Sequence, residues 1–193
     1  MKHVQVYSIE NFDRLREETL SHMDIPVSEL AVYGDYDARG DHNQWSFNPK
    51  PYSDVTKKLI KDAIEKYCES WGCNSYILNT LWYHVYNKGG SYMLHTHTLA
   101  NMAGVIHLLL EDERDCTTIV GYDGKIKEGE VVLFPSMTPH TSKPVHGKKI
   151  IISFGWDMYS TNLIVYSIIF LQSPNISLRN RPSVLIGKYS SYF

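Results

Sequence analysis

Cysteine is scarce in this chain of 193 residues: Cys68, Cys73 and Cys116 are its three cysteines, and they form no CxxC pair. An odd and sparse set excludes a disulfide framework and is typical of reduced thiols in a cytosolic protein. Long hydrophobic runs are also lacking, since the longest, 163–171, is about half of what a bilayer requires. The amino-terminal stretch is charged too early for a signal peptide. We therefore expect a cytoplasmic protein without a membrane partner.

A strong excess of either charge is absent as well. The net charge is -2, so no basic surface indicates nucleic acid as a partner. Hydrophobic residues make up 43% and charged residues 21%, as in ordinary globular proteins. The length suits one domain. The aromatic content of 12% favours a fold rich in sheet, because aromatic side chains fit pleated, half-buried surfaces.

The first part of the chain is predicted to hold one strand and two helices. Residues 3–9 alternate in polarity as a strand does, and 11–21 favour a helix with Asn11 as its N-cap. Residues 33–52 are rich in Gly, Asp, Asn and Pro and predict a loop, which carries Trp45 and Phe47. Residues 54–70 predict the clearest helix, capped by Ser53 and ended by Gly72. Its apolar stripe is expected to pack on a sheet.

Short strands separated by turns follow Gly72. They are predicted at 76–86, 103–110, 117–120, 131–134 and 149–156. Such spacing favours a barrel or jelly roll, so we expect a mainly β (α+β) fold with N-terminal helices packed on the major sheet. One domain is assigned to residues 1–157.

Residues 158–193 form a C-terminal extension of different composition. They contain no acidic residue and carry a charge of +3, against -5 for the rest of the chain. A dimer arm, a strand covering the barrel and a poorly ordered tail are all compatible with this composition, so a homodimer formed through this extension is one expectation.

Histidine supplies the first candidate site. In a strand, residues i and i+2 point to the same face, so His95 and His97 can chelate one metal ion if 95–97 is extended. Two solvated loop histidines are the alternative. His140 follows the predicted strand 131–134 and is a candidate third ligand. Three imidazoles suit Fe, Zn, Cu or Ni and leave coordination positions open, as catalytic sites require.

Lys149, nine residues after His140, begins the last predicted strand. A solvated strand-end lysine is one interpretation. The other is a buried ammonium group that pairs with the distal carboxylate of a diacid, because an unpaired buried charge is costly.

These features occur in an order that resembles the phage and marine-bacterial 2-oxoglutarate/Fe(II) oxygenases, relatives of the prolyl-hydroxylase-like group. The resemblance covers residues 79–155. It rests on Trp82, Gly89-Gly90, His95, His97, Ala103-Gly104-Val105, Glu128-Gly129, Leu133-Phe134-Pro135-Ser136, His140, Lys149 and Ser153-Phe154.

The resemblance implies a double-stranded β-helix, the jelly-roll or cupin-like barrel. It implies iron at His95, His97 and His140, and 2-oxoglutarate bound through its C5 carboxylate at Lys149. A hydroxyl or amide from Tyr83, Tyr86 or Asn101 is expected to assist. The implied activity is the O2-dependent hydroxylation of an unidentified small molecule or peptide, with 2-oxoglutarate decarboxylated to succinate, in the cytoplasm of a bacterial or phage-infected cell.

Three positions depart from the family's pattern. His97 stands where many members have a carboxylate, which makes the metal site less negative. Lys149 replaces the usual arginine and lacks its bidentate fork. Gly155 follows Phe154 where asparagine is usual.

Other histidines and aromatic residues lie near these motifs. His84 is the most plausible residue to support the ligands, whereas His107 and His146 are expected to be packing or surface residues. Trp45, Phe47 and Tyr92 are candidates for the border of a substrate entrance.

Two other functions compete with this interpretation. A cupin-type dioxygenase or isomerase would use the same barrel and three histidines without 2-oxoglutarate. A non-catalytic binding or virion-associated module on the same barrel is the second alternative, supported by the extension after Asp157.

Overall fold

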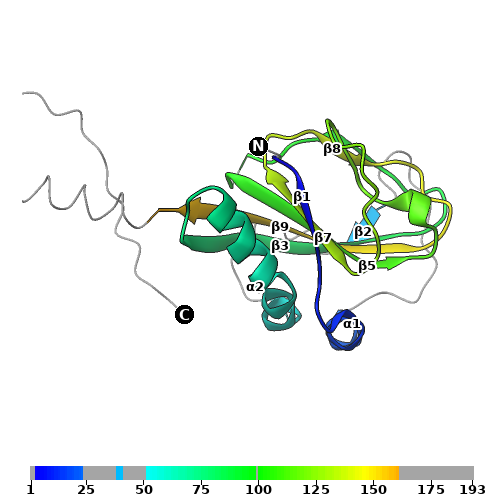
Figure 1. The fold of residues 1–193 in the computed structure, drawn as a ribbon. Coiled ribbons are helices and arrows are strands. Elements are labelled where there is room, and N and C mark those ends of the chain that lie inside the picture. Colours follow the sequence, from blue (N-terminus) through cyan, green and yellow to red (C-terminus); the bar gives the residue numbers. More distant parts are fainter. Residues whose placement is uncertain (1–2, 24–37, 41–50, 99, 161–193) are drawn as a thin grey trace, which may run out of the picture. The chain divides into compact units, whose positions relative to one another are not determined.

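The computed structural model describes residues 3–23, 38–40, 51–98 and 100–160 of the chain. Within them the fold is mainly β, with two antiparallel sheets and two α-helices, consistent with a β-sandwich or jelly-roll-like arrangement (Figure 1). None of the described helices is long and apolar enough to cross a membrane.

The large sheet has six strands in the order β1-β7-β5-β9-β3-β2, and all neighbours are antiparallel. Its strands are β1 (Gln5–Ser8), β2 (Ala38–Gly40), β3 (Ser75–Tyr86), β5 (Met102–Leu110), β7 (Glu130–Pro135) and β9 (Lys149–Tyr159). The longest pairing joins β3 to β9, so segments about seventy residues apart lie side by side.

The small sheet has three strands in the order β4-β8-β6, with bounds Tyr92–His95, His140–Ser142 and Thr118–Ile119. A hydrophobic cluster lies where the small sheet faces the large one. It is formed by Tyr86, Ala103, Val105, Ile119, Ile126, Val132, Phe134, Val145 and Ile151. Because strand side chains alternate between faces, β3, β5, β7 and β9 each contribute to this cluster and to the core on the other face of the sheet.

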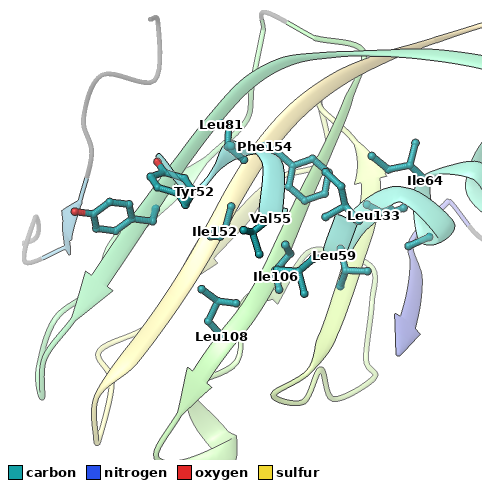
Figure 2. Close-up of a cluster of buried hydrophobic side chains, with 14 of the residues drawn as sticks. Tyr52, Val55, Leu59, Ile64, Leu81, Ile106, Leu108, Leu133, Ile152 and Phe154 are labelled. Atoms are coloured by element: carbon teal, nitrogen blue, oxygen red, sulfur yellow. The ribbon is translucent and has the colours of Figure 1, made fainter. Parts of the chain in front are cut away.

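The helices α1 (Phe12–Ser21) and α2 (Ser53–Ser70) cover the face of the large sheet opposite the small sheet (Figure 1). Figure 2 shows Val55, Leu59 and Ile64 of α2 packed against strand residues including Ile106, Leu133, Ile152 and Phe154. The prediction that N-terminal helices pack on the major sheet is therefore confirmed.

The end of α2 also follows its prediction. Gly72 has φ +69°, and the amides of Gly72 and Cys73 donate to the carbonyls of Glu69 and Cys68. This is the Schellman arrangement, in which glycine adopts the left-handed conformation without a Cβ penalty. Asn11 lies at the N-cap of α1 as predicted, although its side chain makes no capping hydrogen bond. The cap predicted for α2 was wrong, because Tyr52 takes the N-cap position and Ser53 is the first helical residue.

Three short strands escaped prediction. β4 and β8 carry the histidines, and β2 lies within residues 33–52, which were predicted to be a loop. Trp45, Phe47 and the rest of that loop lie outside the described residues. The chain divides into compact units at residues 160 and 161, and β9 runs to Tyr159. Most of the predicted extension lies outside the part of the chain that the structure describes, so its role stays a prediction.

Candidate metal centre

Three histidines converge at the edge of the small sheet. His95 ends β4 and pairs with His140, the first residue of β8. His97 lies two residues beyond β4, and its amide donates to the carbonyl of Ser136 at 2.9 Å. The potential ligand atoms of the three rings all lie within 4.8 Å of one another. The structure therefore brings together the three predicted ligands, although His97 lies past the end of the strand that was expected to carry it.

Backbone carbonyls fix the tautomers of two of these rings. Nδ1 of His95 lies 2.9 Å from the carbonyl oxygen of Met93, and Nδ1 of His140 lies 3.0 Å from that of Thr138. A carbonyl oxygen only accepts, so each Nδ1 carries the proton and each Nε2 keeps a lone pair. This is the arrangement that orients imidazole ligands in metal sites.

Burial keeps the three imidazoles neutral. Burial, reinforced by the nearby His95 ring, lowers the pKa of His97 to about 4 and that of His140 to about 3. Burial also lowers the pKa of His95. Neutral imidazole is the form that binds a metal ion, so the rings can act as ligands at neutral pH.

The spacing of the rings fits a single metal ion. Nε2 of His97 and Nε2 of His140 are 3.1 Å apart. Two nitrogen ligands at about 2.1 Å from one metal lie about 3.0 to 3.4 Å apart at octahedral or tetrahedral angles. The donor set is three nitrogens without a carboxylate, which suits several divalent transition metals.

The histidines line a pocket of about 240 Å³ between the two sheets. Residues of β3 and β9 form the wall from the large sheet, and residues of β4 and β8 form the wall from the small sheet. The lining consists of Thr80, Trp82, His84, Tyr86, Tyr92, His95, Thr96, His97, Thr98, Ala100, Val105, Thr117, His140, Thr141, Ser142, Ile151, Ser153 and Gly155.

Lys149 lies behind one end of this pocket with no exposed surface. Its Nζ donates to Ser142 Oγ at 2.9 Å, lies 3.5 Å from Thr117 Oγ1, and lies 5.1 Å from the centre of the Tyr86 ring. All three of these neighbours line the pocket. Among the described residues, no carboxylate lies within salt-bridge distance of this ammonium group. The interpretation as a solvated strand-end lysine was therefore wrong.

Burial lowers the pKa of Lys149 to about 7, although the charges of Cys116 and Asp115 act in the opposite direction. A buried ammonium group held only by hydroxyl groups lacks the counter-ion that would compensate its desolvation. This end of the pocket is therefore suited to bind an anion, and a carboxylate is the simplest example.

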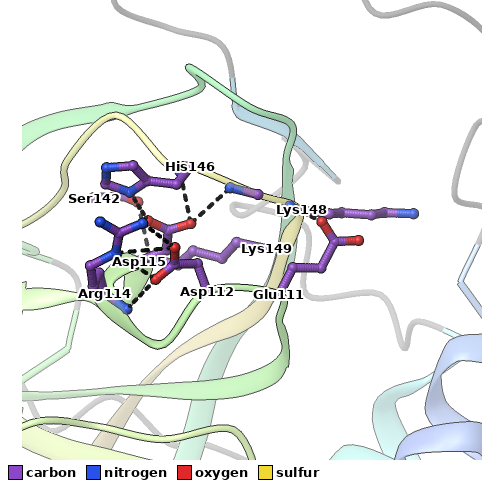
Figure 3. Close-up of polar contacts among 9 residues, drawn as sticks. Glu111, Asp112, Arg114, Asp115, Ser142, His146, Lys148 and Lys149 are labelled. Carbon is purple, nitrogen blue, oxygen red and sulfur yellow. Dashed lines mark hydrogen bonds and ion pairs between the residues drawn. The ribbon is translucent and has the colours of Figure 1, made fainter.

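Hydrogen bonds to the carboxylate of Asp115, here called the Asp115 clamp, fix the turn that leads into Lys149 (Figure 3). The buried carboxylate of Asp115 accepts hydrogen bonds from the amides of His146 and Gly147 at 2.8 and 3.0 Å. It also accepts one from Nδ1 of His146 at 2.7 Å. Burial by itself raises the pKa of Asp115, but these hydrogen bonds outweigh it and the net pKa is lowered. The clamp therefore holds the backbone immediately before Lys149.

The structure separates the three residues that were expected to assist Lys149. Tyr86 lines the pocket beside the ammonium group. Tyr83 belongs to the core under the helices, where its ring lies 5.5 Å from that of Tyr52. The reason is geometric, because positions 83 and 86 of one strand point to opposite faces. Asn101 is exposed and bonds to Asp157 and Met158, away from the pocket lining.

The remaining histidines have distinct surroundings. His84 lines the pocket, with Nδ1 3.1 Å from the Tyr86 hydroxyl and its ring stacked on Tyr92. His107 is fully buried, and its Nε2 accepts from the amide of Thr117. His146 belongs to the Asp115 clamp, with a side chain 55% exposed.

Sequence reasoning missed several polar residues of the pocket. Ser142 and Thr117 hold Lys149, and Thr80 and Ser153 line the opposite end. Thr80 and Ser153 share strand faces with Trp82 and Gly155, so an i, i+2 pattern was available for them. Ser142 and Thr117 lie in or beside very short strands, which gave no such signal.

No protein-family model matches the chain, and no curated protein matches its sequence. Solved structures do match its fold. The viral collagen prolyl hydroxylase of Paramecium bursaria Chlorella virus-1, in its 2OG complex, has a TM-score of 0.59 and 17% identity. The match covers 80% of this chain and 96% of that one.

Two further structures agree. A prolyl hydroxylase of Trichoplax adhaerens, in complex with a hypoxia inducible factor oxygen degradation domain peptide fragment, has a TM-score of 0.57, 13% identity and coverage of 86% and 88%. A 2OG-Fe(II) oxygenase family oxidoreductase of Burkholderia pseudomallei has a TM-score of 0.58, 12% identity and coverage of 80% and 85%. The chain therefore shares the fold of the 2-oxoglutarate/Fe(II) oxygenases, with a three-histidine cluster in its pocket.

Proposed function

We propose that the chain is a non-haem Fe(II), 2-oxoglutarate-dependent oxygenase on a double-stranded β-helix. One observation carries this proposal: a cluster of three neutral imidazoles and a buried, uncompensated lysine serve the same pocket. His95, His97 and His140 would hold the iron, and the spacing of the rings and the fixed tautomers of His95 and His140 fit that role. The fold shared with known oxygenases supports the same assignment.

Each residue has a defined task in this proposal. Bound iron would let O2 oxidise 2-oxoglutarate to succinate and CO2 while the prime substrate is hydroxylated. Lys149 would bind the distal carboxylate of 2-oxoglutarate, with Ser142 and Thr117 orienting its ammonium group. Tyr86 would form the floor beneath that carboxylate, held by its hydrogen bond to His84. The surrounding apolar side chains exclude water from this end.

The three-nitrogen ligand set favours a second candidate, a cupin-type metal dioxygenase or isomerase that uses no 2-oxoglutarate. The buried Lys149 argues against it, because such an enzyme has no need of a carboxylate receptor behind its pocket. The two candidates differ in one measurement. In the oxygenase, 2-oxoglutarate raises the melting temperature of the Mn(II)-loaded protein, whereas in the cupin-type enzyme it causes no shift.

Uncoupled turnover tests the proposal without knowledge of the prime substrate. We expect the full-length protein, loaded anaerobically with Fe(II) and then exposed to O2, to convert 2-oxoglutarate slowly to succinate. His140→Ala should lose both the bound metal and all succinate formation, because it removes a ligand from the cluster. His22→Ala, at an exposed site outside the pocket, is the matched control and should behave as the parent protein.

Succinate formation by His140→Ala at the parent rate would contradict the assignment. Metal analysis that finds far less than one equivalent in the parent protein would favour the third alternative, a non-catalytic binding module on the same fold.

A further inference from the structure

The two ends of the pocket differ in how their polar groups are satisfied. At the Lys149 end, hydroxyl groups bond within the protein. Ser142 Oγ accepts from Lys149, Thr117 Oγ1 lies 3.0 Å from His107 Nε2, and Thr141 Oγ1 donates to the carbonyl of Tyr92 at 2.6 Å. This end is therefore organised before any ligand arrives.

Three polar groups at the other end have no such partners within the ranges that the structure describes. Thr80 and Trp82 lie on one face of β3, and the register places Ser153 of β9 directly opposite Trp82. Trp82 is 5% exposed and its Nε1 is buried without a hydrogen-bond partner among the described residues. Ser153 is 7% exposed, and within the described part of the chain neither its hydroxyl nor that of Thr80 makes a hydrogen bond.

These three residues, the outer polar cluster, lie close to the metal centre but far from Lys149. The Trp82 ring centre is 5.4 Å from that of His97. Tyr86 pairs with Lys149 in the sheet, and six residues of strand separate it from Thr80. At about 3.3 Å per residue, Thr80 lies roughly 20 Å along its strand from Tyr86, and Trp82 and Ser153 lie roughly 13 Å along their strands from Tyr86 and Lys149, so one small ligand group cannot serve both ends.

The outer cluster also lies in an uncharged environment. Among the described residues, the pocket lining includes no aspartate, glutamate, lysine or arginine. A carboxylate, phosphate or ammonium group placed there would lose its hydration without an oppositely charged side chain to pair with, which costs several kcal/mol. An uncharged polar group instead satisfies the buried indole N–H of Trp82, which would cost about 1 to 3 kcal/mol if left unpaired, and gives a partner to the two pocket-lining hydroxyls.

We propose that Thr80, Trp82 and Ser153 form the recognition site for an uncharged amide or alcohol group of the prime substrate. An oxygen atom of that group accepts a hydrogen bond from Trp82 Nε1, and the two hydroxyls bond to its remaining donors and acceptors. This rests on the proposed function only in naming the occupant as the prime substrate; the binding site itself follows from the unpartnered groups.

Gly155 preserves the geometry of this site. A Cβ at position 155 would lie 2.6 Å from Thr80 Oγ1 and 3.1 Å from the Cβ of Ala100. Any side chain there would displace the Thr80 hydroxyl and narrow the pocket, since all three residues line it. The glycine at this position is therefore explained by the site.

Three small probes of similar size test the proposal: N-methylacetamide, acetate and methylammonium. The full-length protein, labelled with 15N in its indole groups, is titrated with each probe in saturating Zn(II) and 2-oxoglutarate. Added 2-oxoglutarate keeps acetate from the Lys149 end. Trp82→Phe assigns the Trp82 indole signal. Trp71 and Trp156 also have buried, unpartnered Nε1 atoms and lie outside the pocket lining, so they are internal references.

We expect N-methylacetamide to shift the Trp82 signal in a saturable way, while the two charged probes and the two reference signals show no comparable shift. Ser153→Ala and Thr80→Val should each weaken the binding of N-methylacetamide about three- to tenfold, which is the effect of one lost hydrogen bond. Thr118→Val, on β6 outside the pocket, should leave the affinity unchanged.

An equal shift with acetate, no saturable shift with the amide, or unchanged affinity in Ser153→Ala would overturn the proposal. A protein that binds the amide at Trp82 yet gains no stability from 2-oxoglutarate would keep this site and contradict the proposed function. The two failures are therefore distinguishable.

Discussion

The ammonium group of Lys149 has a buried environment of hydroxyl groups and one aromatic ring. Desolvation dominates its electrostatics, so its pKa falls to about 7 rather than staying near 10.5. His107 adjoins the same region and its own pKa is lowered well below 6.5, first by burial and then by the charge of Lys149. The groups that favour the charged lysine are Cys116 and Asp115.

This environment predicts a pH dependence for 2-oxoglutarate. Binding needs the protonated lysine, and a bound carboxylate raises its pKa, so protein and ligand take up a proton together. Affinity should be nearly constant below about pH 7 and should fall about tenfold per pH unit above it. Calorimetry on the Mn(II)-loaded protein between about pH 6 and 9 measures this.

Lys149→Arg is the matched control, because a guanidinium group stays protonated throughout this range. Its affinity should be independent of pH. A parent protein whose affinity is equally flat would show that the lysine is already charged without ligand, or that it does not contact 2-oxoglutarate.

The turn between β8 and β9, which leads into Lys149, is held in place by hydrogen bonds to another element of the fold. Asp115 lies in a short 3-10 turn (Glu113–Asp115) and bonds to the residues just before β9. Asp115→Ala leaves two partly buried amides without an acceptor, so we expect a loss of about 1 to 3 kcal/mol in unfolding free energy. The variant should also weaken the binding of 2-oxoglutarate about tenfold, because the backbone before Lys149 is released and a charge that favours the ammonium form is lost.

Urea unfolding and a calorimetric titration of the same Asp115→Ala sample check both effects. Asp112→Ala provides the comparison, since Asp112 pairs with the exposed Arg114 and does not bond to the turn. If both variants bind 2-oxoglutarate equally well, the clamp does not position Lys149.

Helix α2 has a structural role that can be separated from the metal centre. Ile64 has no exposed surface and packs on the sheet face opposite the pocket. Ile64→Ala should lower the unfolding free energy by about 2 to 5 kcal/mol, the cost of a large-to-small change in a core. Metal stoichiometry at low temperature should stay unchanged, because the histidines lie on the other side of the large sheet.

Glu65→Ala, on the exposed face of the same helix, should change stability by less than about 0.5 kcal/mol. Loss of metal from the folded Ile64→Ala protein would mean that the helical layer and the metal centre are coupled more strongly than the packing suggests.

Long periodic elements could be predicted from the sequence, whereas several of the short strands could not. The apolar stripe of α2 and the strands β3, β5 and β9 each contain enough residues to show a period. β2, β4 and β8 contain four residues or fewer, so their existence depends on pairing partners distant in sequence. For that reason His95 and His140 were assigned together from motif order, while their pairing across the small sheet was not foreseen.

Side-chain direction limited the prediction of the co-substrate site. Tyr83 and Tyr86 were proposed together, yet their side chains point to opposite faces of a regular strand. Tyr86 lies on the pocket face, and Tyr83 lies in the core on the other face. Whether Lys149 was buried also depended on its neighbours. Its burial follows from Ser142, Thr117 and Tyr86, which come from three separate segments.

At the scale of the molecule, residues 3–160 form three layers wherever they are described: helices, the large sheet and the small sheet. The helices stabilise one face of the large sheet, which leaves its other face to form the pocket with the small sheet. The homodimer expected through residues 158–193 stays a prediction, because most of that segment lies outside the described residues.

The central claim is that the three histidines and Lys149 bind one metal ion and one 2-oxoglutarate molecule. A crystal structure of the full-length protein with Mn(II) and 2-oxoglutarate, prepared without oxygen, tests it most directly. We predict one metal ion held by Nε2 of His95, His97 and His140, with the far carboxylate of 2-oxoglutarate bonded to Lys149 Nζ. A metal ion held elsewhere, or a carboxylate bound away from Lys149, would contradict the account.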